Sequence, residues 1–265
     1  MSRIAARFET LRARGETALI PFITAGDPDL ETTAQLVLAM AESGADLIEI
    51  GVPFSDPIAE GPTIQRASER ALAKGASLRA ILSLVARLRD EVEIPLLLMG
   101  YANPLHAMGA EAFAEAAANA GVDGIIIPDL PPEEGEPFFA PCRERGIDPV
   151  LLASPTTRPE RLKRLVGETR GFLYYVSLQG VTGARSELAE GIEAMVGQAK
   201  AAGDVPVCVG FGISTPEHAA RVGAFADGVV VGSAFVDVIE QAPSPAAAVD
   251  AVAKLVAELK APLRP

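Results

Sequence analysis

Eight short apolar runs, separated by stretches with helical periodicity, constrain the fold of this chain more than any other feature. The runs are Leu19–Thr24, Asp46–Gly51, Pro95–Gly100, Gly124–Pro128, Pro149–Ala153, Phe172–Ser177, Val205–Gly210 and Gly228–Gly232. They are mostly apolar throughout rather than alternating, which is typical of strands buried on both faces of a parallel sheet. The stretches with helical periodicity include Glu31–Ser43, Leu78–Asp90, Glu111–Ala120, Pro159–Glu168, Glu190–Ala202 and Pro216–Val222.

Three of the joints between a helical stretch and the next apolar run resemble each other. They are Gly44–Leu47, Gly121–Gly124 and Phe225–Gly228, and each has aspartate as its third residue. A recurring helix–turn–strand joint is typical of a repeated strand and helix unit. Eight such units in 265 residues predict an α/β protein of the (β/α)8 TIM barrel class.

The stretch Ser2–Arg14 predicts an extra N-terminal helix, because Ile4, Phe8 and Leu11 fall on one face and a glycine follows. A doubly wound open sheet is the alternative architecture. That fold normally carries a glycine-rich fingerprint after its first strand, and Ala25–Pro28 lacks it. No change of composition and no linker interrupts the chain, so we expect a single domain over residues 1–265.

The charge balance limits the classes of partner. The formal net charge is −12, and nucleic acids or anionic membranes need clustered Lys and Arg. The apolar run Ile94–Leu105 is too short to span a bilayer, and no signal peptide is visible, so we expect a soluble, cytoplasmic protein. Two cysteines, Cys142 and Cys208, argue against a disulfide framework and are expected to be buried, inert thiols.

Glu49 is the residue whose surroundings point most directly to chemistry. It lies inside an apolar run, and a buried charged carboxylate without a partner costs several kcal/mol. No predicted strand carries Lys or Arg, so an ion pair inside the barrel is not expected. We therefore interpret Glu49 as a carboxyl group with a raised pKa that acts as an acid–base catalyst.

Lysine and histidine are scarce, and this narrows the possible reactions. The lysines are Lys74, Lys163, Lys200, Lys254 and Lys260, and all fall in helical patterns rather than at strand ends. A Schiff-base mechanism, which needs a lysine amine in the pocket, is therefore disfavoured. His106 and His218 are far apart in the sequence, so we expect no metal site.

The ends of the last two predicted strands suggest a phosphate site. Barrel enzymes bind phosphate in the loops after strands seven and eight. Gly212 and Gly232–Ser233 fall in those two loops, and Ser214–Glu217 carries the signals of a helix start. Free N–H groups at helix N-termini can bind phosphate without lysine, which suits an acidic chain. The alternative is that these glycines only make tight turns.

Five stretches resemble one known family. They are Pro21–Pro28, Glu49–Gln65, Tyr101–Pro104, Gly180–Gly183 and Gly210–Ser214. In their order and spacing they are similar to the α subunits of tryptophan synthase, and the resemblance covers the chain from about residue 20 to residue 235. The second stretch is the specific one, since the glycine motifs alone would indicate only a phosphate-binding barrel.

The resemblance implies a reaction. The family cleaves indole-3-glycerol phosphate into indole and glyceraldehyde 3-phosphate, in the retro-aldol direction and without a cofactor, during L-tryptophan biosynthesis. By resemblance, Glu49 moves protons between indole C3 and a glyceryl hydroxyl. Glu60 stands where the family most often has aspartate, the carboxylate that stabilises positive charge near the indole nitrogen.

The resemblance also implies how substrate is bound. Four residues are expected around the indole: Phe22, Tyr101, Asp129 and Tyr174. Four are expected to bind phosphate, mainly through the backbone: Gly183, Gly212, Gly232 and Ser233. Thr182 belongs to a loop that closes over the substrate and contacts the catalytic carboxylates.

A partner is implied as well. The family docks on a β subunit that holds pyridoxal phosphate and receives indole, in an α2β2 heterotetramer. The loop expected to dock carries Pro53, Phe54, Ser55, Asp56 and Pro57, with its Pro and Phe exposed. This chain itself is expected to hold neither pyridoxal phosphate nor metal.

Three other functions stay open at the level of sequence. One is a related barrel enzyme, such as an isomerase of histidine or tryptophan biosynthesis, which would lack the Val52–Pro62 loop. Another is a free-standing lyase that releases indole without a β partner. The third is a non-catalytic subunit that only activates its partner, an idea that Glu60 favours and the retained Glu49 disfavours.

Overall fold

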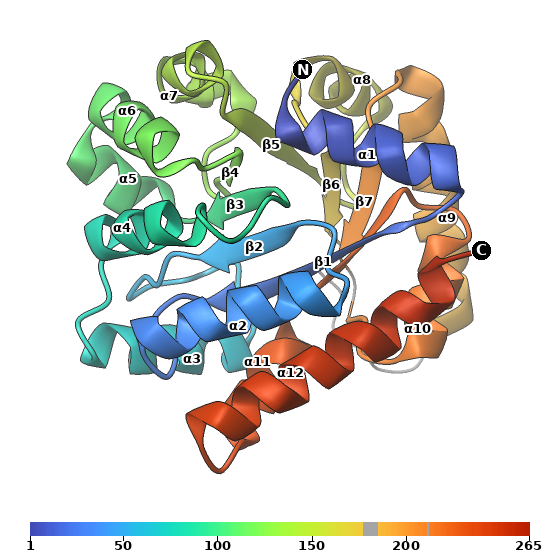
Figure 1. Cartoon of the computed structure of the whole chain (residues 1–265). Coiled ribbons are helices and arrows are strands. Elements are labelled where there is room, and N and C mark those ends of the chain that lie inside the picture. Colours follow the sequence, from blue (N-terminus) through green and yellow to red (C-terminus); the bar gives the residue numbers. More distant parts are fainter. Residues whose placement is uncertain (177–184, 211) are drawn as a thin grey trace.

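Eight parallel strands close into a barrel, as predicted. The structure, a computed structural model, describes residues 1–176, 185–210 and 212–265. The strands are β1 (Ala18–Thr24), β2 (Ile48–Gly51), β3 (Leu96–Met99), β4 (Gly124–Ile126), β5 (Asp148–Ala153), β6 (Leu173–Val176), β7 (Val207–Gly210) and β8 (Gly228–Val231), in that order around the barrel (Figure 1). Each predicted strand is confirmed to within two residues at both ends, and the open sheet is excluded.

Helices surround the barrel. They are α1 (Arg3–Arg14), α2 (Leu30–Ser43), α3 (Pro62–Ala73), α4 (Leu78–Leu88), α5 (Ala102–Met108), α6 (Ala110–Ala120), α7 (Pro132–Glu144), α8 (Pro159–Glu168), α9 (Arg185–Ala202), α10 (Pro216–Gly223), α11 (Ser233–Gln241) and α12 (Pro245–Lys260), followed by a short 3-10 turn (Ala261–Leu263). All six helical stretches predicted after the first strand are confirmed, although α9 begins five residues earlier than expected.

The predicted N-terminal helix is also confirmed, and it seals one mouth of the barrel. Ser2 caps it by accepting from the N–H of Ala5, and Gly15 ends it in a left-handed conformation. The apolar face of α1, which holds Ile4, Phe8 and Leu11, packs against the inward side chains of the strands. Figure 1 shows the position of the helix. This closes the amino ends of the strands and leaves the carboxyl ends for the site.

The recurring aspartate at the strand joints has a local role. One carboxylate oxygen of Asp46 accepts from the N–H of Leu19 at 2.7 Å, and Asp123 and Asp227 accept at 2.8 Å from the first N–H groups of β3 and β7. Each aspartate therefore joins the start of its own strand to the start of a preceding one. The repeat recognised in the sequence is a hydrogen-bonding device that sets strand register at the amino end.

Two layers of apolar side chains fill the fold. The inner layer lies inside the barrel and includes Ile20, Leu97, Ile126, Tyr174 and Val230. The outer layer lies between the strands and the helices. Both cysteines are free and buried, and burial raises the pKa of the Cys142 thiol to about 12, as expected for unreactive thiols.

Candidate active site

Glu49 lies inside the barrel with its carboxyl group isolated. It sits in β2, in register with Phe22 of β1 and Leu97 of β3, and its side chain is fully buried. Among the described residues, neither carboxylate oxygen has a hydrogen-bond partner. Burial raises the pKa of Glu49 well above its usual range, and the negative charge of Glu60 raises it further. The ion pair that the sequence argued against is not found in the part of the chain described here.

Glu60 is held at the end of the β2–α3 loop, next to this group. Its N–H donates to the carbonyl of Pro57 at 3.0 Å, and its own carbonyl accepts from the side-chain amide of Gln65 at 2.9 Å. Burial raises the pKa of Glu60 to about 7. Two carboxyl groups with raised pKa values therefore lie close enough to each other for the charge of Glu60 to raise the pKa of Glu49. Glu60 follows the carboxyl end of β2, and barrel enzymes do their chemistry at the carboxyl ends of their strands.

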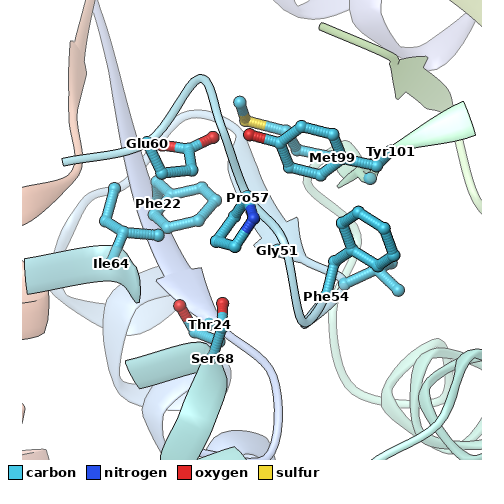
Figure 2. Close-up of a pocket in the computed structure, with 12 residues that line it drawn as sticks. Phe22, Thr24, Gly51, Phe54, Pro57, Glu60, Ile64, Ser68, Met99 and Tyr101 are labelled. Atoms are coloured by element: carbon cyan, nitrogen blue, oxygen red, sulfur yellow. The ribbon is translucent and has the colours of Figure 1, made fainter. Parts of the chain in front are cut away.

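A small inner cavity lies beside Glu60. Its volume is about 20 Å³, and it is lined by Phe22, Thr24, Gly51, Val52, Phe54, Pro57, Glu60, Ile64, Ser68, Met99, Gly100 and Tyr101. Figure 2 shows the Glu60 carboxylate and the Tyr101 hydroxyl toward one end, and Thr24 with Ser68 toward the other. Gly51 makes room for Phe22, since a Cβ at position 51 would lie 2.5 Å from the Phe22 ring. The lining is mostly apolar, as an aromatic ligand requires.

A larger outer cleft adjoins this cavity. Its volume is about 380 Å³, and it is lined by Glu60, Gly61, Pro62, Thr63, Ile64, Tyr174, Gly210, Gly212, Ile213, Val230, Gly232 and Ser233. Glu60 and Ile64 line both cavities, so the two cavities lie on either side of these residues. The structure thus brings Tyr174 and the glycines after β7 and β8 together with Glu60.

The predicted phosphate site lies where the loops after β7 and β8 meet the outer cleft. Gly212 has φ of +46°, a conformation that favours glycine, and Gly232 lies directly before Ser233, the first residue of α11. Among the described residues, no side chain caps the N-terminus of α11, whereas Thr215 caps α10 by accepting from the N–H of His218. Uncapped N–H groups at a helix start attract anions, and this one opens on the outer cleft.

The β2–α3 loop is packed differently from what the sequence suggested. We expected an exposed Pro and Phe, but Pro53 is buried and Phe54 is half-buried against Tyr101, with the rings 5.3 Å apart. The Tyr101 hydroxyl also accepts from the N–H of Ala59 at 2.8 Å. Ser55, Asp56 and Ile58 are exposed, with 84% of Ile58 accessible, and Pro57 lines the inner cavity.

Some predicted site residues lie elsewhere. Asp129 is exposed and lines neither cavity; its carboxylate accepts from the N–H of Ala102 at 2.8 Å and so supports the start of α5, beside Tyr101. Thr182 and Gly183 lie outside the described residues. Sequence reasoning missed Thr24 and Ser68, buried hydroxyls that line the inner cavity. Their only signal was position: Thr24 ends β1, and Ser68 follows Ile64 by one helical turn on α3.

The described part of the chain shows neither a cluster of metal ligands nor a membrane-spanning helix. Within residues 1–176, 185–210 and 212–265, no group of three or more His, Cys, Asp or Glu side chains is placed to hold a metal ion. In the same part of the chain, no helix combines the length and apolar character needed to cross a bilayer.

Comparison with known proteins places the chain in a family. A family model described as tryptophan synthase alpha chain matches residues 8–264. The chain is 53% identical over 241 residues to the tryptophan synthase alpha chain of Citrifermentans bemidjiense, covering 91% of this chain and 90% of that one. It is 50% identical over 262 residues to the alpha chain of Thioalkalivibrio sulfidiphilus, with 98% of both chains covered.

Solved structures agree with this. The crystal structure of tryptophan synthase subunit alpha from Legionella pneumophila matches with a TM-score of 0.91 at 41% identity, covering 99% of this chain and 98% of that one. A chain of tryptophan synthase from M. tuberculosis matches with a TM-score of 0.90 at 36% identity, covering 100% and 99%. The chain therefore belongs to the tryptophan synthase alpha chain family, the lyases that cleave indole-3-glycerol phosphate in tryptophan biosynthesis.

Proposed function

We propose that Glu49 and Glu60 are the two catalytic groups with which this chain cleaves indole-3-glycerol phosphate. The observation that carries the proposal is the isolation of Glu49, a fully buried carboxyl group without a hydrogen-bond partner among the described residues. Structural ion pairs do not leave a carboxyl group in this condition. A neutral carboxyl group that can both give and take a proton is what a retro-aldol cleavage requires.

In this proposal Glu49 transfers a proton in two successive steps. Neutral Glu49 donates its proton to indole C3, which leaves a positive charge on the ring nitrogen. The resulting carboxylate takes the proton from the glyceryl hydroxyl, the C–C bond breaks, and its electrons return to the ring. Indole and glyceraldehyde 3-phosphate leave, and Glu49 is again protonated, so no co-reactant is consumed.

Glu60 and the backbone supply the other contributions. A carboxylate at Glu60 stabilises the positive charge on the indole nitrogen in a site that excludes water. The indole is proposed to contact Phe22, Tyr101 and Tyr174, with Asp129 acting through the start of α5. The phosphate is proposed to bind the N–H groups of Gly212, Gly232 and Ser233, together with Gly183, and Thr182 is proposed to close over the substrate.

We also propose the compartment and the partner of this chain from its family. We infer that residues 1–265 act as one domain in the cytoplasm, docked on a β subunit that carries pyridoxal phosphate, in an α2β2 assembly. This chain needs no cofactor of its own, because the indole ring accepts the electrons. Support for docking comes from the β2–α3 loop, whose exposed residues Ser55, Asp56 and Ile58 adjoin the residues that line the inner cavity.

Indole release from indole-3-glycerol phosphate tests the proposal. Wild type, Glu49→Gln and the exposed control Glu133→Gln are measured alone and with a tryptophan synthase β subunit. We expect Glu49→Gln to lose at least ~100-fold in turnover while its unfolding midpoint is retained, and the control to match wild type. Turnover of Glu49→Gln within tenfold of wild type contradicts the catalytic role.

Indole release measured with and without the β subunit distinguishes a docked lyase from a free-standing lyase and from a non-catalytic activating subunit. Slow release that rises steeply with the β subunit supports docking. Fast release that the partner leaves unchanged indicates a free-standing lyase. Absence of release, combined with activation of the β subunit, indicates a non-catalytic activating subunit.

A further inference from the structure

Helices α3 and α11 both begin at the site. Helix α3 begins beside Glu60, and α11 begins at the proposed phosphate site. Helix α3 starts at Pro62, two residues after Glu60, and α11 starts at Ser233. The first residues of both helices line the outer cleft, and the two helices pack against each other. The placement of α3 relative to α11 therefore sets the separation between the Glu60 carboxylate and the proposed phosphate site.

Further along α3, one guanidinium group contacts both α11 and the turn after β1. Arg70 of α3 forms a fork with Asp27, with Nε and Nη2 each donating at 2.8 Å to a different carboxylate oxygen. Its Nη1 donates at 2.6 Å to Glu240 of α11. Arg70 thus binds the turn after β1 and the end of α11 at once. Paired N–H groups on one carboxylate fix orientation as well as distance.

The turn that Arg70 binds has little freedom of its own. Asp27 is 3% exposed, and both of its carboxylate oxygens accept from the Arg70 fork. Gly26 packs so closely on the end of α3 and the segment after it that a Cβ would lie 3.3 Å from Ala71 of α3 and 2.6 Å from Ala76. The turn after β1 and the end of α3 therefore behave as one packed unit, and this unit begins directly after Thr24, which lines the inner cavity.

Arg66 provides a natural comparison, one helical turn earlier on α3. Its Nε and Nη2 donate to Glu240 at 3.0 Å and 2.7 Å. It makes no bond to Asp27 and is more exposed, with 48% of its side chain accessible against 34% for Arg70. Replacing each arginine in turn therefore separates the effect of the Arg70–Asp27 link on catalysis from the effect of the link to Glu240, which both arginines make.

We propose that Arg70 is a positioning residue for the lyase reaction. Through Asp27 and Glu240 it holds α3 in place against β1 and α11, and so holds Glu60 and Ile64 at the correct distance from the phosphate end. The proposal rests on the site assigned above. A displacement of about 1 Å between reacting groups can cost ~100-fold in rate.

Replacing Arg70 should weaken the binding only of ligands that reach both the indole end and the phosphate end of the site. Arg70→Lys keeps the charge but loses the fork, so we expect kcat to fall ~10- to 100-fold. A non-cleavable indolylalkyl phosphate, which reaches both ends, should bind ~10-fold more weakly. Glycerol phosphate alone and indole alone should bind within twofold of wild type, because each touches only one end.

The control variants make the test decisive. Arg66→Lys should leave kcat, KM and all three affinities within twofold of wild type. Asp27→Asn should reproduce the loss in Arg70→Lys, and the double variant should lose little more than either single one, since the two residues act as a unit.

Two results would overturn the proposal. One is unchanged kcat and unchanged affinity for the spanning ligand in Arg70→Lys. The other is an equal loss for all ligands with a lower unfolding midpoint, which indicates a merely structural role. Failure of the proposed function is recognised separately, because it appears as undiminished turnover in Glu49→Gln with Arg70 intact.

Discussion

At the scale of single residues, the contrast between Glu49 and the other buried acids is informative. Asp46 accepts from Leu19 and pairs with Lys260, and Asp123 accepts from Leu96 and pairs with Arg89. These aspartates are buried because they are fully partnered. Glu49 has no such partners among the described residues, so its burial costs stability and is best understood as a requirement of the reaction.

Thr24 offers a test of how the inner cavity is used. Its hydroxyl is buried and has no hydrogen-bond partner among the described residues. Replacing it in Thr24→Val removes an unpaired polar group at nearly constant volume, so we expect the free energy of unfolding to rise by about 1 kcal/mol. Urea unfolding measures this, with the hydrogen-bonded Thr169→Val expected to lose stability instead. A destabilised Thr24→Val would show that this hydroxyl is satisfied in solution.

Candidate site residues could be predicted from the sequence where their residue type contrasts with its neighbours or with its place in a strand. Glu49 stands out as a carboxyl group in an apolar run, and Gly212 as a glycine at a strand end. Thr24 and Ser68 carry no such contrast, because small hydroxyl residues are ordinary at strand ends and on helices. The partial burial of Phe54 was missed for another reason: it depends on stacking against Tyr101, which follows a different strand.

At the scale of elements, the strands were predictable and part of the helices was not. Continuous apolar runs mark buried parallel strands whatever their neighbours. Helix α3 was missed because its buried face consists of the small residues Ala67, Ser68 and Ala71, which give little hydrophobic contrast. Helix α7 contains Pro137 and Pro141, which usually signal breaks, yet its apolar side packs into the core. The roles of Ile64, Ser68 and Arg70 therefore needed the structure.

The loop after β7 carries a prediction at this scale. Gly212→Ala places a side chain at a left-handed position that lines the outer cleft, so we expect glycerol phosphate to bind about 10-fold more weakly. Indole binding should be unchanged. Gly75→Ala is the matched control, since Gly75 has φ of +80° with nothing within 4 Å of an added Cβ. Equal losses of both ligands would argue for misfolding and against a phosphate site.

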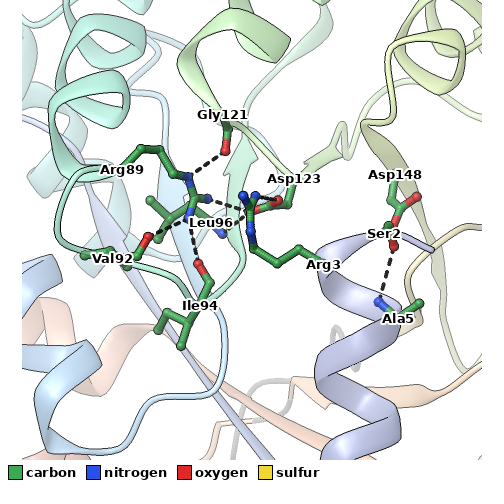
Figure 3. A network of polar contacts seen from close by, with 10 residues as sticks. All are labelled: Ser2, Arg3, Ala5, Arg89, Val92, Ile94, Leu96, Gly121, Asp123 and Asp148. Carbon is green, nitrogen blue, oxygen red and sulfur yellow. Dashed lines mark hydrogen bonds and ion pairs between the residues drawn. The ribbon is translucent and has the colours of Figure 1, made fainter.

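At the scale of the whole molecule, the two mouths of the barrel are built for different tasks. Figure 3 shows the amino-end mouth, where Arg3 of α1 and Arg89 bind Asp123, and Ser2 binds Asp148. This end is therefore tied by ion pairs and hydrogen bonds. The carboxyl end instead holds Glu49 and Glu60 with raised pKa values. Stability and reactivity are placed at opposite ends of one fold.

This division predicts stability changes without loss of catalysis. Lys260, 2% exposed, donates to Asp46 at 2.9 Å, and Asp46 lies at the amino end of β2. In Asp46→Asn, Lys260 keeps its ion pair with Glu16 but loses its buried carboxylate partner, and Arg7 loses an ion pair as well. We therefore expect the free energy of unfolding to fall by about 1.5–3 kcal/mol while kcat per folded molecule stays within twofold. Glu258→Gln, which removes an exposed pair with Lys254, should change it by less than about 1 kcal/mol. A large fall in kcat in Asp46→Asn would contradict the division.

The pH dependence of kcat/KM tests the central claim most directly, because both catalytic carboxyl groups have raised pKa values. Glu60 must be ionised to stabilise positive charge, so activity should rise with pH through about 7 and then fall at higher pH as Glu49 loses its proton. In Glu60→Gln the residual activity should lack the rise near 7 and keep the fall. A rise near pH 7 that persists in Glu60→Gln would contradict the account.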